Sequence, residues 1–277
     1  YMPIVFAGIA PHGDEIVPEL VKDIDEKCYR LKNAMEEFAK KLYEKQPEVI
    51  IIATPHNLRI DKHIGVIISS FLEGTIKTDY GAISILHFTD KILAKQIYEK
   101  ALQRELPIVA VNYGTSEGEA SKMCLDWGTI IPLWFIKKHY DKMKRALPPV
   151  IVITPSREIP RENLVELGKI IAELADYTEK KVAFVASADQ GHAHDPKGPY
   201  GFDEASKEFD SFVQKVIQEN QLEKLLSLSD DFLERAKPDS YWQMLILLGI
   251  LKRAPLRNTL LTYECPTYFG MLVAIYE

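Results

Sequence analysis

Two histidines stand in the same local pattern, each directly after an apolar run and a proline. His12 follows the run Ile4–Ala10, and His56 follows the run 49–54. Apolar, β-branched runs of this length predict buried strands of an α/β sheet, and such sheets bind ligands at the carboxyl ends of their strands. Because histidine is the commonest metal ligand, the repeated pattern suggests a metal site; the alternative is an ordinary Pro-His turn.

Two more side chains extend this pattern. His192 follows the apolar run 181–187 and a turn of small residues, and Glu264 comes two residues after the apolar run 259–262. Glu264 reads either as an anionic ligand or as an edge-strand glutamate facing water. Two histidines and one carboxylate form the facial triad of non-haem Fe(II) oxygenases, but the spacing suits a zinc hydrolase equally well. The sequence has no His-Glu-x-x-His, no Gly-rich phosphate loop and no Gly-x-Ser-x-Gly motif.

The remaining four histidines carry weaker signals. His63 and His139 stand beside lysines and are expected at the surface. His87 lies in an alternating run and is expected to pack in the core, while His194 is expected to be a solvated loop residue.

Strands and helices alternate along the chain and would position these residues. Apolar runs predict strands at 4–10, 49–54, 65–71, 82–88, 107–111, 150–154 and 181–187, with a closing hairpin of 258–263 and 270–276. Helix-spaced apolar residues predict helices at 17–45, 94–106, 161–178, 204–219, 222–226 and 240–252, and a helix or strand opens within 124–134. A polar loop covers 188–203. The pattern predicts one α/β domain over residues 1–277, with a central mixed sheet flanked by helices and a metal site at strand ends.

Composition excludes several classes of function. With 277 residues, 47% of them hydrophobic, and a net charge of −6, the chain does not favour nucleic acid or an anionic membrane as a partner. No apolar run is long enough to span a bilayer and no signal peptide is recognisable, so we expect a cytoplasmic location. Three scattered cysteines argue against a disulfide framework or a cysteine-rich zinc site.

Four separated segments carry a family resemblance. They are Ala-Pro-His-Gly-Asp-Glu at 10–15, Thr-Pro-His-Asn at 54–57, Ser-Ala-Asp-Gln-Gly-His at 187–192 with its continuation to 210, and Leu-Thr-Tyr-Glu at 261–264 with Tyr-Phe-Gly at 268–270. In these segments the chain resembles the class III extradiol dioxygenases of the LigB-type superfamily. It is most similar to the LigB-like proteins of the AMMECR1/Memo group.

The resemblance implies a site and a reaction. His12, His56 and Glu264 would be the metal ligands, and His192 the catalytic acid/base. The implied cofactor is Fe(2+), although two histidines and a carboxylate also suit Zn(2+) or Mn(2+). The implied partners are O₂ and a small aromatic substrate, a catechol-like or aminophenol-like ring that is opened beside the diol. A homo-oligomer is also consistent with the family.

One departure from the family pattern concerns the substrate pocket. The family often has Asp-His-Gly-Thr where this chain has Asp126, Trp127, Gly128 and Thr129. A tryptophan can stack on an aromatic ring, but it cannot accept a proton. Trp127 is expected either to line the pocket, together with Asn57 and Asp126, or to pack in the core at its base.

Three functions therefore stay open. The first is an extradiol dioxygenase. The second is a Memo-like, non-catalytic protein of the same fold that binds a metal or a peptide. The third is a metal-dependent hydrolase that uses the same ligands.

Overall fold

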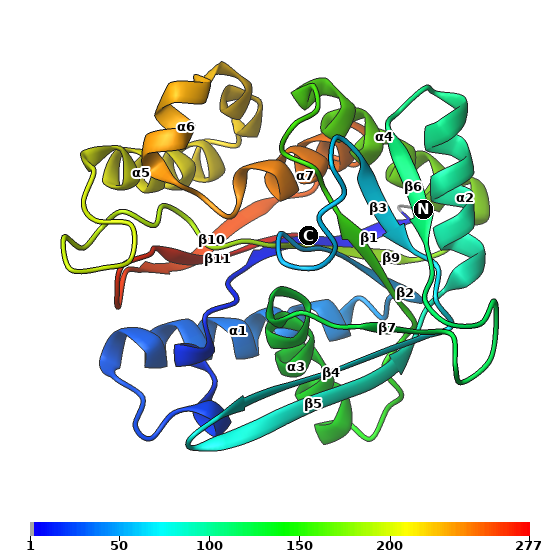
Figure 1. Cartoon of the computed structure of the whole chain (residues 1–277), viewed down its shortest axis with the longest axis horizontal. Coiled ribbons are helices and arrows are strands. Elements are labelled where there is room, and N and C mark those ends of the chain that lie inside the picture. The colour runs from blue at the N-terminus through cyan, green and yellow to red at the C-terminus, as the bar shows by residue number, and fades with distance from the viewer. Residues whose placement is uncertain (1–2) are drawn as a thin grey trace.

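A mixed sheet of eight strands forms the centre of the molecule, in the order β10-β11-β1-β9-β2-β8-β3-β6 (Figure 1). The computed structural model describes residues 3–277. The strands are β1 (Ile4–Ala10), β2 (Val49–Ala53), β3 (Ile64–Ile67), β6 (Ile108–Val111), β8 (Val150–Thr154), β9 (Val182–Ser187), β10 (Asn258–Glu264) and β11 (Met271–Tyr276). Strands β1, β9, β2 and β8 run parallel, whereas β11 pairs antiparallel with β1 and β3 pairs antiparallel with β8. The carboxyl ends of β1, β9 and β2 therefore meet at one edge.

The central strands are apolar throughout because both faces of the sheet are covered. In β2, Val49, Ile51 and Ala53 belong to the core on one side, and Ile50 and Ile52 belong to the core on the other. Successive side chains of a strand point to opposite faces, so a strand buried on both sides must be apolar at every position.

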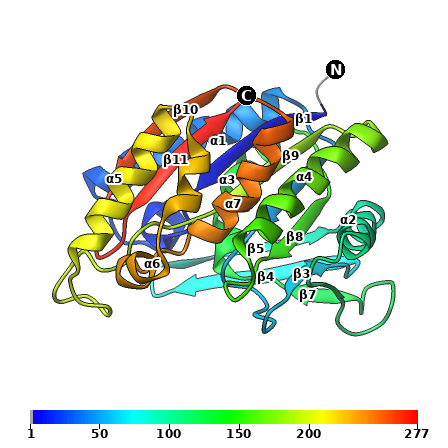
Figure 2. The same cartoon turned by 90° about the horizontal axis from the view of Figure 1, so that it is seen from above.

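Helices form a layer on each face of the sheet (Figures 1 and 2). The upper layer in Figure 1 contains α4 (Arg161–Thr178), α5 (Glu204–Gln218), α6 (Asp230–Ala236) and α7 (Tyr241–Arg253), with α2 (Lys91–Gln103) towards the β3 and β6 side. The lower layer contains α1 (Glu26–Glu44) and α3 (Trp127–Lys142). Three short 3-10 turns complete the helical elements described: η1 (Asp14–Ile16), η2 (Pro18–Leu20) and η3 (Leu222–Ser227).

Two glycines let α4 and α7 touch. A Cβ on Gly168 would lie 2.0 Å from the carbonyl oxygen of Ile246, and one on Gly249 would lie 1.8 Å from that of Val165. No other residue permits backbones to approach this closely. This contact packs α7 closely against α4.

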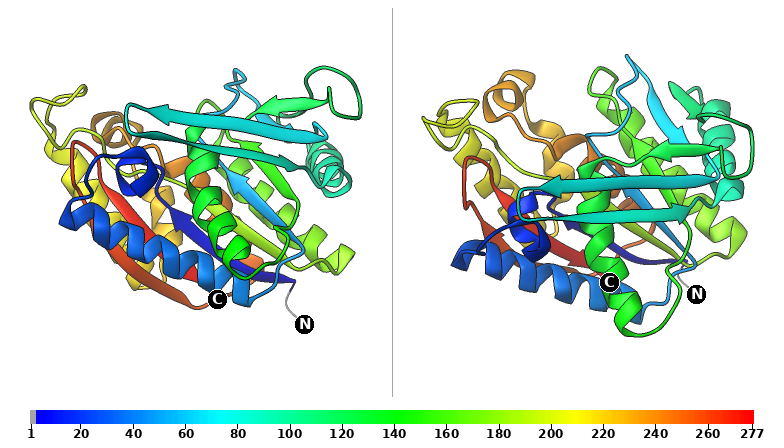
Figure 3. Two further views of the ribbon diagram at one scale, coloured as in Figure 1. Left: turned by 90° about the horizontal axis from the view of Figure 1, so that it is seen from below. Right: turned by 60° about the horizontal axis from the view of Figure 1, so that its bottom comes forward.

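A second, three-stranded sheet lies beyond α3, in the order β5-β4-β7 (Figure 3). Its strands are β4 (Phe71–Thr78), β5 (Gly81–Phe88) and β7 (Lys122–Cys124). Strand β4 contributes residues to the outer wall of the cavity described below.

The structure confirms the α/β class, the single domain and the mixed sheet between helices. Two local predictions were wrong. The helix expected from residue 17 begins at Glu26, because Pro18 opens a separate 3-10 turn and Asp25 caps the helix by accepting from the N–H of Cys28. The strand expected at 65–71 is divided between β3 and β4, which lie in different sheets. The element expected to open within 124–134 is confirmed as a helix, α3, which begins at Trp127. Among residues 3–277 we find no helix with the length and apolar character needed to cross a bilayer.

Candidate metal centre

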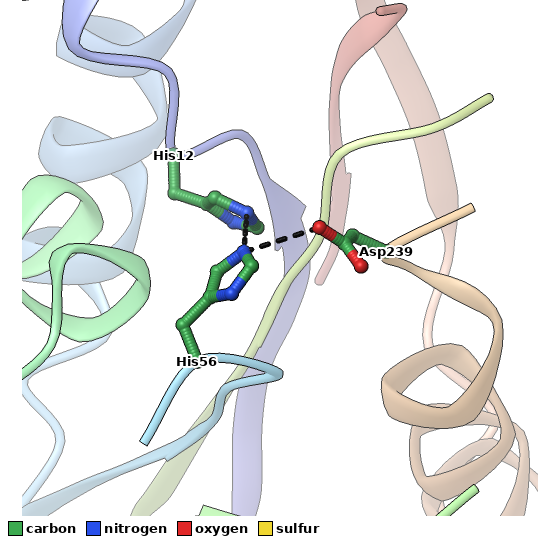
Figure 4. A group of neighbouring side chains, drawn as sticks. All are labelled: His12, His56 and Asp239. Carbon is green, nitrogen blue, oxygen red and sulfur yellow. Dashed lines mark hydrogen bonds and ion pairs between the residues drawn. The ribbon is translucent and has the colours of Figure 1, made fainter. Parts of the chain in front are cut away.

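His12 and His56 meet above the ends of their strands, as the two Pro-His segments predict. His12 follows β1 and His56 follows β2, and β9 lies between these strands in the sheet. Their Nε2 atoms face each other at 3.1 Å, with the two rings nearly perpendicular (Figure 4). The proline before each histidine restricts the backbone at the turn, so both imidazoles leave the sheet edge in a defined direction.

Asp239 supplies the third ligand atom of this cluster. Its Oδ2 lies 3.2 Å from Nε2 of His56, and the three side chains each offer one ligand atom within 4.8 Å of the others (Figure 4). Asp239 stands two residues before α7, and its N–H donates to the carbonyl oxygen of Asp189 at 3.0 Å. This bond ties the start of α7 to the segment that follows β9.

Glu264, the carboxylate expected from the sequence, lies elsewhere. It ends the edge strand β10, which β11 separates from β1, and its Oε1 accepts from Nε of Arg30 at 2.5 Å. The structure therefore does not bring Glu264 to the two histidines. Asp239 takes the place assigned to Glu264, because the edge strand points its last residue towards α1 instead of the centre of the sheet.

The sequence carries one signal that points to Asp239. Pro238 precedes Asp239, just as a proline precedes His12 and His56. An aspartate before an apolar helix is also typical of a helix start, and that interpretation explains the residue without any role as a ligand.

Ser187 sets the tautomer of His12. The Ser187 hydroxyl donates to the carbonyl of Gly128, so its oxygen accepts from Nδ1 of His12 at 3.0 Å. Nε2 of His12 is then left with a lone pair pointing at His56. Burial, followed by the nearby His56, lowers the pKa of His12 well below its ordinary range, so the ring is neutral, as a metal ligand must be.

Asp189 completes the buried surroundings of His12. Its Oδ1 accepts from the backbone N–H of His12 at 3.1 Å, and its Oδ2 lies 3.2 Å from Nε2 of His12. Burial raises the pKa of Asp189 well above its ordinary range. Burial therefore disfavours the anionic form of Asp189, and Asp239 is the carboxylate of the cluster.

Asp239 stays ionised despite its surroundings. Burial by itself raises the pKa of this carboxyl group, but the hydrogen bond from His56 and the electrostatic interactions with His192 and Arg157 hold it well below its ordinary range. The site thus places one carboxylate oxygen beside two imidazole nitrogens.

His192 stands beside the three candidate ligands. Its Nδ1 donates to the carbonyl of Gln190 at 2.7 Å, which leaves Nε2 of the neutral ring without a proton, 3.7 Å from Oδ2 of Asp239. Phe269 stacks on the ring at 5.1 Å between centroids and fixes its plane. Burial lowers the pKa of His192, although the Asp239 charge opposes the shift. A neutral imidazole with a free nitrogen can accept a proton, as a general base does.

A cavity of about 820 Å³ opens onto these side chains, and Trp127, Asn57 and Asp126 all line it. The indole of Trp127 stacks on the ring of His56 at 4.2 Å and 24°, and the residue is 49% exposed. Trp127 is therefore a wall of the cavity and not a core residue.

Asn57 and Asp126 also hold the wall together. Asn57 donates from Nδ2 to Oδ1 of Asp126 at 3.0 Å, and Asp126 caps α3 by accepting from the N–H of Thr129. A Cβ on Gly128 would lie 2.5 Å from Oγ1 of Thr54, so glycine is needed for α3 to start this close to the end of β2.

The other four histidines lie away from the cluster. His63 is exposed, His139 packs partly buried against Tyr43, and His87 bonds the carbonyl of Pro148 in a half-buried position. His194 was wrongly expected to be solvated: its ring is buried and bonds Oδ2 of Asp210 at 2.8 Å.

The donor set fits a divalent metal ion. Two imidazole Nε2 atoms and one carboxylate oxygen lie close to one another. Among the described residues, no lysine or arginine side chain is bonded to either nitrogen. Two nitrogens and one oxygen suit Fe(2+), Zn(2+) and Mn(2+) alike, so the chemistry of the ligands does not select the ion.

Comparison with known proteins identifies the family of this chain. The family described as the catalytic LigB subunit of aromatic ring-opening dioxygenase matches residues 7–274. Protein CA_C1420 of Clostridium acetobutylicum is 26% identical over 258 residues, which cover 92% of this chain and 54% of that protein. This chain thus spans about half the length of that relative.

A solved structure shares the fold. The crystal structure of the uncharacterized protein JW3007 from Escherichia coli K12 superposes with a TM-score of 0.61 at 16% identity, covering 99% of this chain and 100% of that one. Closeness to the Memo-like proteins stays a prediction. The family match over nearly the whole chain shows that it belongs to the LigB family of aromatic ring-opening dioxygenase catalytic subunits.

Proposed function

We propose that this chain is a metal-dependent dioxygenase, which adds O₂ to a catechol-like or aminophenol-like ring and opens the ring beside those substituents. One observation carries the proposal: His12, His56 and Asp239 converge beside a neutral His192 at the wall of a cavity. Membership of the LigB family supports an oxygenase. We propose Fe(2+) as the ion, with Zn(2+) and Mn(2+) as alternatives.

The metal ion would hold the two ring substituents and O₂ together and favour loss of the phenol proton. His192 is placed to take that proton, because its Nε2 is free and its Nδ1 is fixed by Gln190. The later return of the same proton to an oxygen of the product needs no other group. Phe269 keeps the imidazole plane constant between the two transfers.

The aromatic walls of the cavity would orient the substrate ring. Trp127 offers its indole face beside His56, and Tyr268 and Tyr200 lie around His192. Flat aromatic walls favour a flat aromatic substrate through stacking, which contributes about 0.5–1.5 kcal/mol per ring pair beyond burial.

Trp127 also favours a second candidate function. The indole cannot accept a proton, so the cavity wall beside His56 has no base at this position. A protein of this family that binds a metal or a peptide without opening rings would tolerate that loss.

The test begins with protein purified anaerobically under reducing conditions. We expect about one iron per chain after reconstitution and O₂ uptake with members of a panel of catechols and aminophenols. His192→Ala is expected to keep the iron and to lose turnover, by about 10²- to 10⁴-fold for loss of a general base. His56→Ala is expected to lose the iron.

Two results would point elsewhere. Iron binding without O₂ uptake across the panel supports the non-catalytic alternative. Hydrolysis of ester or amide substrates by the zinc form, without O₂ uptake by the iron form, supports a hydrolase. Equal iron content in wild type and His56→Ala contradicts the site itself.

A further inference from the structure

The two carboxylate oxygens of Asp239 face different groups. Oδ2 lies 3.2 Å from Nε2 of His56 and 3.7 Å from Nε2 of His192, on the side of the cluster. Oδ1 points away from the cluster and accepts from Nη2 of Arg157 at 2.5 Å. The carboxylate is therefore held between an inner and an outer partner.

Arg157 is itself held in place. It follows β8 by three residues, and its guanidinium stacks on the indole of Trp242 at 4.3 Å. Trp242 lies in the first turn of α7, three residues after Asp239. Arg157 therefore links the end of β8 to the start of α7, with its planar group clamped between an indole and a carboxylate.

The backbone of Asp239 is fixed by separate bonds. Its N–H donates to Asp189, and its carbonyl accepts from Nε2 of Gln243 at 2.7 Å. With the backbone fixed, the main freedom left to the residue is rotation of the carboxylate, and Arg157 is the group that opposes this rotation.

We propose that Arg157 is a positioning residue, which occupies Oδ1 of Asp239 so that only Oδ2 is presented to a bound cation. The inference rests on the proposed metal site. By engaging one oxygen, Arg157 makes Asp239 a one-oxygen ligand and leaves positions on the cation free for other groups. Partners of metal ligands typically change metal affinity by about 10- to 100-fold when they are removed.

Two effects of Arg157 on a cation oppose each other. Its positive charge repels the cation, but it acts from behind the carboxylate and is paired with it. Its hydrogen bond orients the ligand. Arginine suits this role better than lysine, because its planar, forked group can stack and donate at the same time. We therefore expect orientation to outweigh repulsion.

The experiment compares three variants of the whole chain by anaerobic Co(2+) titration. Arg157→Gln removes the charge and the stack, and Arg157→Lys keeps the charge alone. Arg161→Gln is the matched control. Arg161 also stacks on an α7 aromatic ring, Tyr241 at 5.0 Å, and pairs with an aspartate, but that residue is Asp230, outside the cluster.

We expect Arg157→Gln to weaken Co(2+) binding about 10- to 100-fold and to change the visible absorption bands, which report the ligand geometry. Arg157→Lys should restore part of the affinity but not the wild-type spectrum, and Arg161→Gln should match wild type in both. The thermal midpoint of each apo variant is measured as a folding control. If Arg157→Gln does not fold, the spectrum of Arg157→Lys tests the positioning role.

The inference is overturned by a wild-type Kd and spectrum in Arg157→Gln, by a wild-type spectrum in Arg157→Lys, or by an equal loss in Arg161→Gln. These outcomes leave the metal site intact. Absence of Co(2+) binding by the wild-type chain overturns both the metal site and this inference, so the two failures are distinguishable.

Discussion

Exchanging the charge of Asp239 for an amide tests the placement of the candidate ligands most directly. Asp239→Asn keeps the shape of the side chain and its capacity to accept from Arg157 at one atom, but it removes the only carboxylate among the three clustered residues. Glu264→Gln is the matched variant, since it makes the same chemical change at the residue that the sequence favours.

The magnitude follows from the geometry. A cation between the three ligand atoms, which lie within 4.8 Å of one another, is at most about 4 Å from the Asp239 charge. At an effective dielectric constant of about 20, two unit charges at this distance attract by about 4 kcal/mol. Arg157 already offsets part of the carboxylate charge, so we count the attraction of a single positive charge instead of two. Losing about 4 kcal/mol of attraction should weaken metal binding about a thousandfold.

Glu264→Gln should leave the metal affinity unchanged. The Arg30 side chain is 44% exposed, so solvent screens this ion pair and its loss should leave the fold intact. The assay is Co(2+) titration of the apo protein, with elemental analysis of iron after anaerobic reconstitution. The reasoning is refuted if Glu264→Gln loses the metal while Asp239→Asn retains it.

Three further predictions concern the neighbouring groups. His192→Asn should bind Co(2+) within about twofold of wild type yet lose about 10²- to 10⁴-fold in turnover, and a parallel loss of metal would contradict its placement off the metal. Ser187→Ala deprives Nδ1 of His12 of its acceptor and should weaken Co(2+) binding about 10- to 100-fold; an unchanged Kd would show that the tautomer is set otherwise. Burial opposes the charge of His194, but the hydrogen bond to Asp210 raises its pKa from 6.5 to about 9, so this pair stabilises the fold fully below pH 6.5 and the stabilisation disappears as pH rises through 9. Urea unfolding between pH 6 and 10 should show this decline in wild type and a flatter curve in His194→Gln, and equal slopes would contradict it.

Much of the fold follows from local pattern. The apolar runs at β1, β2, β8 and β9 are visible in the sequence because strands buried on both faces must be apolar at every position. The start of α1 was misplaced because helix-spaced apolar residues continue through the 3-10 turns before Glu26. Strand β4 was missed because only one of its eight residues, Leu72, is buried in a small, separate sheet.

The sequence by itself determined that the two histidines lie close together. Each follows its own strand and a proline, and the strand ends of a parallel sheet meet at one edge. Which carboxylate joins the two histidines was decided only by the tertiary structure. Glu264 and Asp239 both stand near element ends, but β10 is an edge strand that points Glu264 at Arg30, whereas a backbone hydrogen bond to Asp189 holds Asp239 beside the histidines. No local pattern encodes that bond, because it joins two segments that are far apart in the sequence and meet only when α7 packs on the sheet.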